Sequence, residues 1–268
     1  PCQKSFYLGN CNMKIIGVVP VRMAASRFPG KPLYPILGRP MLEHVVLRAQ
    51  MYKGWSRLVV ATCDHEIEQF AVEKGYQVVM TGAHHTRALD RVAEAVTRLD
   101  EAVSDDDIVV CVQGDEPMMR PDMIDTVLAP LIADPNKAGT ILAMHITDES
   151  IWRNPDTVKI IHNAAGEVLY TSRAPVPYCK GDFSADLLAR RIYGIFAFRW
   201  KYLKAFTEHP ETRLEEIEAC DSNRILDMPF RQHIAPYAHI KSFSVDSLSD
   251  IALVEGQIAD DGYWHLYK

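Results

Sequence analysis

The segment from residue 22 to residue 32 concentrates polar side chains that could hold an anion. It reads Arg22-Met23-Ala24-Ala25-Ser26-Arg27-Phe28-Pro29-Gly30-Lys31-Pro32. Cations, a hydroxyl and a flexible glycine this close together can surround a polyphosphate with charged side chains and backbone N–H groups. It is not a Walker A loop, because Ala25 replaces a required glycine and Pro32 replaces the Ser or Thr that would touch magnesium. Its composition alone is compatible with either phosphate binding or an ordinary solvated basic loop.

A second polar segment, Gln113-Gly114-Asp115-Glu116-Pro117, directly follows an apolar run. A carboxylate fixed there, opposite a triphosphate, is where a hard cation such as Mg²⁺ would be held. Asp115 is therefore a candidate metal ligand, although Gly-Asp is also common turn chemistry. Asp246 likewise follows an apolar run, and taken alone it is interpreted as the N-cap of the next helix.

Other chemistries find little support in the residue pattern. His84 and His85 are adjacent, so on a regular element they would point in different directions, and a role in a loop is expected instead. The chain has no H-E-x-x-H motif, and Ser172 has no Gly-x-Ser-x-Gly elbow, which argues against a zinc protease or a serine hydrolase. The six cysteines include no C-x-x-C pair, so we expect reduced thiols without a redox or zinc role.

Composition narrows the class of protein further. Hydrophobic residues make up 48% and charged residues 24% of the 268 residues, the balance of a soluble globular chain, which we interpret as a single domain over residues 1–268. The 29 Lys and Arg against 35 Asp and Glu argue against a nucleic-acid partner. No run approaches the roughly 18 apolar residues that a membrane span needs. With no secretory signal recognisable at the start, a cytoplasmic location is expected.

The elements that must position the polar segments alternate in type. Apolar runs at 14–21, 58–61, 77–80 and 108–112 predict buried strands, and helical periodicity at 41–49, 66–74 and 89–99 predicts helices between them. This order predicts an α/β fold with a doubly wound, mostly parallel sheet, whose ligands bind at the carboxyl ends of the strands. Both polar segments are expected at those ends.

The pattern changes from about residue 140. Strands at 157–162 and 168–172 around a turn predict a hairpin, and 192–199 predicts another strand. We interpret approximately 140–200 as a β-rich insertion within the domain, a surface suited to dimerisation. A helix at 214–226, a strand at 240–245 and a helix at 248–258 are expected to follow.

Four segments together resemble the CMP-Kdo synthetases, the 3-deoxy-manno-octulosonate cytidylyltransferases. They are residues 19–32, 112–117, 170–177 and 245–250, they stand in the family's order, and they span nearly the whole chain. The resemblance implies a Rossmann-like nucleotidyltransferase with a β-rich dimerisation insertion, acting as a homodimer. It also implies the activity: an acceptor oxygen attacks the α-phosphate of CTP, pyrophosphate leaves, and a CMP-linked product forms with the help of Mg²⁺.

By the same resemblance, individual residues acquire expected roles. Asp115 and Asp246 would bind Mg²⁺, which raises Asp246 from an N-cap to a metal ligand. Gln113 would lie near the acceptor or the α-phosphate, and Arg22, Lys31 and Asp115 would be catalytic. The residues expected to hold the nucleotide are Arg22, Ser26, Arg27, Lys31, Arg87 and Gln113; those expected to hold the acceptor are Gln113, Arg173 and Asp221.

The chain departs from the family pattern mainly on the acceptor side. Ile192 and Phe196 stand at positions where the family has sugar-contacting His and Tyr, and Asp221-Ser222 replaces a Glu-Gln pair. Each sugar hydroxyl left without a partner would cost about 1–3 kcal/mol. The acceptor is thus a Kdo-like 3-deoxy-ulosonate or, alternatively, a small phosphonate or other anion of a natural-product pathway.

Two further alternatives stay open at this stage. Arg173, Arg190 and Arg191 could meet an anionic acceptor, or they could form ordinary surface ion pairs. A non-catalytic nucleotide-binding regulator is the alternative from a different functional class. The retained charged set of Arg22, Lys31, Asp115 and Asp246 argues against such a regulator.

Overall fold

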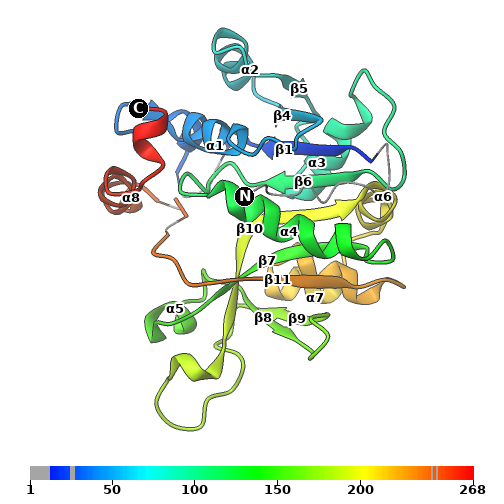
Figure 1. Ribbon diagram of the computed structural model, residues 1–268, viewed down its shortest axis with the longest axis vertical. Coiled ribbons are helices and arrows are strands. Elements are labelled where there is room, and N and C mark those ends of the chain that lie inside the picture. Colours follow the sequence, from blue (N-terminus) through cyan, green and yellow to red (C-terminus); the bar gives the residue numbers. More distant parts are fainter. Residues whose placement is uncertain (1–12, 25–27, 243, 246) are drawn as a thin grey trace, which may run out of the picture.

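The computed structural model describes residues 13–24, 28–242, 244–245 and 247–268. A nine-stranded mixed sheet forms the centre, with strand order β11-β7-β10-β6-β1-β4-β5 and a β8–β9 hairpin attached to β10 (Figure 1). Among the described residues, no helix is long and apolar enough to cross a membrane. The cysteines in the described part, Cys63, Cys111, Cys179 and Cys220, are free thiols.

The parallel half of the sheet matches the strands predicted from apolar runs. It contains β1 (Ile15–Pro20), β4 (Arg57–Thr62), β5 (Val78–Met80) and β6 (Ile108–Val112), all parallel to their neighbours in this half. Every residue of β1 and β6 is buried, as expected for strands covered on both faces. The predicted doubly wound α/β fold is confirmed.

Helices cover both faces of this sheet, and two apolar clusters fill the layers between them. On one side Leu42 and Val45 of α1 and Ile124 of α4 pack against the sheet, and on the other Val92 of α3 and Phe206 of α6 do so. The helices of these layers are α1 (Met41–Gln50), α2 (His65–Glu73), α3 (Ala88–Thr97), α4 (Pro121–Ala133) and α6 (Trp200–Glu208).

β10 (Arg190–Arg199) joins this half to the rest of the molecule. It runs antiparallel to β6 and to β7 (Gly139–His145), with a register shift between Ile192 and Phe196. β11 (Gln232–Tyr237) extends the sheet parallel to β7. The predicted hairpin is present as β8 (Lys159–His162) and β9 (Val168–Ser172), which project beyond the main sheet with α5 (Glu149–Arg153) nearby (Figure 1).

Two predicted elements differ from the structure. The helix predicted over 214–226 is α7 (Arg213–Glu218) and a 3-10 segment (Asp221–Asp227), separated at Ala219, whose φ is +48°. The chain turns there because the buried Arg224 guanidinium donates back to both carboxylate oxygens of Glu215, at 2.9 and 2.7 Å.

The strand predicted over 240–245 was also wrong. The described part of this segment is irregular, because its backbone bonds to loops instead of a neighbouring strand. The Val245 N–H donates to the Asp115 carbonyl at 3.1 Å, and its own carbonyl accepts from Lys31 Nζ at 2.7 Å. No sequence pattern predicted α4, β7, α6 or β11; in α4, Pro130 interrupts the helical signal.

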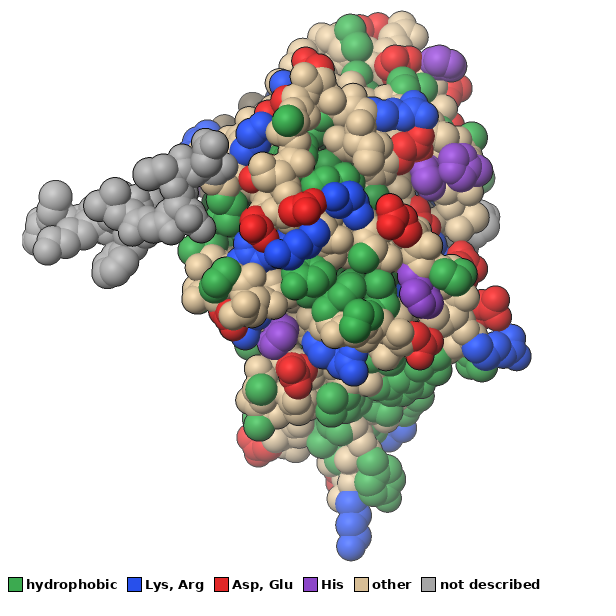
Figure 2. Space-filling view, turned by 90° about the vertical axis from the view of Figure 1, so that its right-hand side faces the viewer, with side chains coloured by type: hydrophobic (Ala, Val, Ile, Leu, Met, Phe, Trp, Pro, Cys, Tyr) green, Lys and Arg blue, Asp and Glu red, His purple; other side chains and the backbone are tan. Residues whose placement is uncertain are grey.

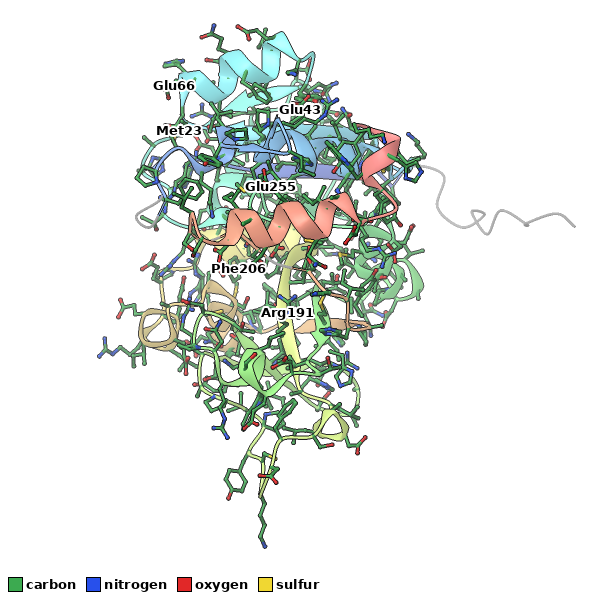
Figure 3. The ribbon with its side chains drawn as sticks, turned by 90° about the vertical axis from the view of Figure 1, so that its left-hand side faces the viewer. Met23, Glu43, Glu66, Arg191, Phe206 and Glu255 are labelled. Atoms are coloured by element: carbon green, nitrogen blue, oxygen red, sulfur yellow. The ribbon has the colours of Figure 1, made fainter. Side chains whose placement is uncertain are left out.

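The C-terminal helix α8 (Asp250–Ala259) lies across one side of the molecule (Figure 3). Glu255 on this helix accepts the backbone N–H of Leu37 at 2.9 Å, and Ile251 and Val254 pack against Ile36. The short elements there are a 3-10 turn (Lys31–Leu33), β2 (Pro35–Ile36), β3 (Arg39–Pro40) and a final 3-10 turn (Trp264–Leu266); a further 3-10 turn (Ala185–Leu187) precedes β10. α8 thereby covers the chain that follows the first polar segment.

Candidate active site

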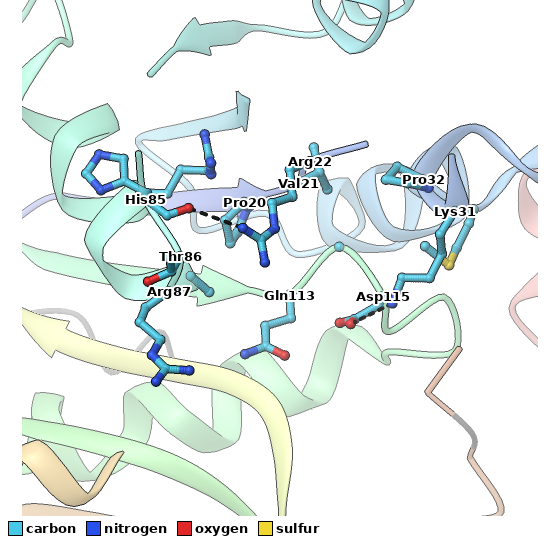
Figure 4. A pocket seen from close by; sticks show the side chains of 14 residues that line it. Pro20, Val21, Arg22, Lys31, Pro32, His85, Thr86, Arg87, Gln113 and Asp115 are labelled. Atoms are coloured by element: carbon cyan, nitrogen blue, oxygen red, sulfur yellow. Dashed lines mark hydrogen bonds and ion pairs between the residues drawn. The ribbon is translucent and has the colours of Figure 1, made fainter. Parts of the chain in front are cut away.

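A first cavity of about 300 Å³ opens where β1 and β6 end (Figure 4). Four of the residues predicted to bind the nucleotide line it: Arg22, Lys31, Arg87 and Gln113. Ser26 and Arg27, predicted for the same role, lie outside the described residues. The folded chain thus gathers cations from the loops after β1 and β5 and an amide from the loop after β6, a wall suited to a polyanion.

Lys31 and Asp115 meet at the rim of this cavity. Lys31 Nζ lies 3.1 Å from Asp115 Oδ2, and about one third of the Asp115 side chain is exposed. The same ammonium donates to the Val245 carbonyl, which holds the segment before residue 246 against the Gln-Gly-Asp loop. Asp246 itself lies outside the described residues.

Gly114 is required by the close approach of two loops. A Cβ at this position would lie 2.0 Å from Val21 Cγ1 and 3.1 Å from the Pro20 carbonyl oxygen. Any side chain here would push the loop after β6 away from the loop after β1. The glycine between Gln113 and Asp115 therefore has a packing reason, because it lets the two predicted polar segments share one cavity wall.

A second cavity of about 740 Å³ adjoins the first, and Gln113 and Asp115 line both. All three residues predicted to bind the acceptor, Gln113, Arg173 and Asp221, lie on its wall. Ile192 and Phe196, which stand at the family's sugar-contacting positions, line it too. The predicted nucleotide and acceptor residues thus fall into two neighbouring cavities.

Of the three arginines considered for an anionic acceptor, two reach the second cavity. Arg191 and Arg173 line it, whereas Arg190 donates to the Ala143 carbonyl at 3.0 Å. Arg173 is also tied to the backbone of α7, since its Nε donates to the Glu218 carbonyl at 2.9 Å. Burial raises the pKa of the Asp221 carboxyl on the same wall, against the lowering effect of the nearby Arg87.

Glu116 is a residue of the second cavity that the sequence analysis did not select. Its Oε1 accepts from Ser244 Oγ at 2.7 Å and from the Gly194 N–H at 3.3 Å, while Oε2 is buried and has no hydrogen-bond partner among the described residues. Burial raises the pKa of this carboxyl to about 7, and the Asp115 charge adds to the effect. Its position beside Asp115 in Gln-Gly-Asp-Glu-Pro was the signal available in the sequence.

The loop between β5 and α3 forms another wall of the first cavity. His85 and Thr86 line it, and the His85 carbonyl accepts from Arg22 Nη1 at 3.4 Å. The loop role predicted for His84 and His85 is confirmed. Their rings nevertheless lie together, with centroids 4.1 Å apart, because the irregular backbone does not separate them as a helix or strand would.

The doubly wound sheet carries a cationic cavity at its strand ends, and a second polar cavity adjoins it. This arrangement suits a nucleotidyltransferase. The family model for cytidylyltransferases matches residues 16–231. The chain belongs to the cytidylyltransferase family, within its group of 3-deoxy-manno-octulosonate cytidylyltransferases. It is a CTP-dependent nucleotidyltransferase, as the resemblance implied.

Two relatives support the assignment to this family. The chain is 40% identical over 240 residues to the 3-deoxy-manno-octulosonate cytidylyltransferase of Nitratidesulfovibrio vulgaris (strain DP4), covering 89% of this chain and 93% of that protein. It is 35% identical over 250 residues to the 8-amino-3,8-dideoxy-manno-octulosonate cytidylyltransferase of Shewanella halifaxensis (strain HAW-EB4), covering 93% and 100%.

A solved structure agrees with these relatives. CMP:2-keto-3-deoxy-manno-octonic acid synthetase complexed with CTP superposes with a TM-score of 0.82 at 31% identity, over 92% of this chain and 99% of that one. Neither the phosphonate alternative nor the regulator alternative is favoured by proteins of these names.

Proposed function

We propose that this enzyme transfers CMP from CTP to a Kdo-like 3-deoxy-ulosonate and releases pyrophosphate. The observation that carries the proposal is that the two cavities share Gln113 and Asp115. A nucleotide in the first cavity and an acid sugar in the second would meet at these two residues. The names of the relatives supply the acceptor class, since both the Kdo and the 8-amino-Kdo enzymes resemble the chain over nearly its full length.

The transfer needs positioning and charge neutralisation more than covalent help from the protein. An acceptor hydroxyl oxygen attacks the α-phosphorus, the bond to the β-phosphate oxygen breaks, and the hydroxyl proton is released. Arg22, Lys31 and Arg87 would neutralise the triphosphate and the leaving pyrophosphate, with Ser26 and Arg27 contributing from the same segment. Gln113 would orient the attacking hydroxyl or the α-phosphate, because its side chain stands between the cavities.

Mg²⁺ is the proposed cofactor, and the residues fit a hard cation. The Asp115 carboxylate already faces an ammonium at the boundary of both cavities and is partly exposed, so a cation can reach it. Asp246, which lies outside the described residues, is proposed as the second ligand on the family resemblance alone. When bound, the ion would neutralise charge on the phosphate oxygens.

The acceptor would be held by the second cavity. Arg191 and Arg173 can meet the carboxylate of an ulosonate, and Asp221 can accept hydrogen bonds from its distal hydroxyls or from an ammonium. Arg191 is well anchored for this role, because its guanidinium carbon lies 5.5 Å from the centre of the Tyr193 ring. Ile192 and Phe196 would pack against carbon atoms of the sugar.

The direct test is pyrophosphate release from CTP and Mg²⁺ with three acceptors: Kdo, its 8-amino analogue and a small phosphonate. Turnover with one or both octulosonates and none with the phosphonate is expected. Turnover that appears only with the phosphonate would contradict the proposed acceptor. Removal of divalent ions by chelation should stop the reaction, and added Mg²⁺ should restore it.

We further propose that the enzyme is a homodimer that pairs through the β8–β9 region. Leu169 on β9 is half exposed, whereas the outer edge of this strand is covered at Thr171, whose backbone bonds to the Asn223 side chain. Tyr178 is also strongly exposed, and apolar side chains gather toward the narrow lower end in Figure 2. Exposed apolar side chains of this kind favour pairing with another chain. Light scattering should give about twice the 30.3 kDa chain mass, and Leu169→Asp should shift it toward one; a monomeric unmodified protein would refute the pairing.

A further inference from the structure

His84, His85 and Glu94 form a cluster that the proposed reaction does not use. One nitrogen of each imidazole and one carboxylate oxygen all lie within 4.8 Å of one another. His85 Nε2 is hydrogen-bonded to Glu94 Oε2, and the two histidine rings lie side by side. The histidines come from the loop after β5, and the carboxylate comes from α3, so the cluster joins a loop to a helix.

Gly82 leaves the space that the cluster occupies. A Cβ there would lie 2.3 Å from His84 Cε1 and 2.4 Å from His84 Nδ1, so a side chain at this position would displace the His84 ring. The Gly82 N–H also donates to Glu94 Oε2 at 2.8 Å and orients the carboxylate toward the histidines. Arg98 pairs with the other oxygen, Oε1, and so leaves Oε2 facing the two rings.

We propose that His84, His85 and Glu94 bind a transition-metal ion of the Zn²⁺ class. Two imidazoles and one carboxylate are a ligand set that such ions prefer, with water completing the coordination. Mg²⁺ prefers oxygen ligands, so this site is chemically distinct from the one proposed at Asp115. The ion would replace the direct contact between His85 and Glu94 and bridge the same two side chains to His84.

The site lies behind a wall of the nucleotide cavity. His85 itself lines that cavity, and its carbonyl accepts from Arg22. A bound ion would therefore fasten the loop of residues 82–87 to α3 and hold this wall in place. The proposal does not depend on which acceptor the enzyme uses, because no acceptor residue takes part in it.

Zinc binding by the full chain tests the proposal directly. The protein is titrated with Zn²⁺ against a chromophoric chelator, with excess Mg²⁺ present to compete at Asp115. His84→Ala is expected to weaken the tightest zinc site by about tenfold or more, because it removes one ligand. His84 is exposed, so the substitution should leave the zinc-free unfolding temperature unchanged. Glu94→Gln should weaken the same site.

The matched control is His65→Ala. His65 is also exposed, and its Nδ1 lies 2.8 Å from Glu68 Oε2. Among the described residues, however, this pair is not part of any group of three possible metal ligands. Its removal should leave the tight site unchanged. The proposal is overturned if the unmodified protein has no tight zinc site, if His84→Ala binds zinc as the unmodified protein does, or if His65→Ala weakens binding equally.

Discussion

The two cavities of the site are built in different ways. The first is lined mainly by the segments that follow β1, β5 and β6 of the parallel sheet, with Met41 of α1 and Arg91 of α3 completing its wall. The second draws its wall from segments spread between residues 113 and 250, including α5, β10 and the 3-10 segment after α7. A site made from strand-end loops can be recognised in the sequence piece by piece, whereas a site made from distant segments depends on how the chain packs.

Their charges differ as well. Positive side chains outnumber negative ones around the first cavity, which suits a triphosphate: Arg22, Lys31, Arg87 and Arg91 stand against Asp115. The second has two arginines against several carboxyl groups, among them Glu116 and Asp221. Such a wall suits an acceptor with one acidic group and many hydrogen-bond donors. The variants below test whether the two cavities can be altered separately.

Asp115→Ala should have the largest effect, because this residue belongs to both cavities and to the proposed metal site. Turnover is expected to fall by about 10³-fold or more, because Mg²⁺ would lose its Asp115 ligand and would no longer neutralise the charge on the phosphates. Steady-state pyrophosphate release measures the loss, and circular dichroism checks that the protein stays folded. Unchanged turnover would remove Asp115 from the mechanism.

Lys31→Met should affect the nucleotide side more than the acceptor side, because Lys31 lines only the first cavity. The loss of the ammonium is expected to lower kcat/KM for CTP by about 10²-fold, with little change in the KM of the acceptor. The exposed Lys53 provides the control, because Lys53→Met removes the same charge from a residue that lines neither cavity. An equal rise in both KM values would show that the cavities are not separable.

Gly194→Ala should disturb the shared boundary from the β10 side. Its Cβ would lie 2.9 Å from both Cβ and Oε1 of Gln113 and 3.0 Å from Glu116 Cγ. We expect a loss of about 1–3 kcal/mol in the free energy of unfolding and a fall in kcat of about tenfold. Gly256→Ala in α8, where nothing lies within 4 Å, should be neutral or stabilising in the same denaturant titration, and a similar loss there would rule out crowding as the cause.

Ile192→His should change how tightly the acceptor binds. It restores a hydrogen-bonding group on the wall of the second cavity, and one added bond is worth about 1 kcal/mol, so the acceptor KM should change by up to about fivefold. The KM for CTP is expected to stay the same. Competitive kinetics with Kdo and its 8-amino analogue measures the change; a shift confined to the CTP KM would contradict the assignment of this wall.

His44 lines neither cavity and should affect stability only. Burial lowers its pKa to about 4, while Nε2 bonds to the Ile36 carbonyl and Nδ1 to the Tyr267 hydroxyl. Between pH 6.5 and 4 the unfolded chain binds more protons, so this residue's contribution is complete above pH 6.5. It is lost as the pH falls, by up to about 3 kcal/mol. Urea titrations at several pH values should show that the free energy of unfolding falls less steeply with acid in His44→Gln than in the unmodified protein. If the two pH dependences are equal, His44 is not the source of the acid loss.

The strands and the first polar segments were predictable because their signals are local. Continuous burial of β1 and β6 requires uninterrupted apolar runs, and the loops after them carry the polar residues. The break at Ala219 was not predictable in this way. It depends on a buried ion pair between Arg224 and Glu215, whose formation the helical periodicity does not reveal.

The parallel strands, the family and four residues on the wall of the first cavity, Arg22, Lys31, Arg87 and Gln113, could be predicted from the sequence alone, because each lies in a short segment with its own physical signature. Only the tertiary structure decided that Glu116 is buried beside Asp115, that Arg191 faces the second cavity while Arg190 does not, and that two adjacent histidines meet Glu94. Those outcomes depend on packing between segments far apart in the chain, where a change of register or a single bulge redirects a side chain.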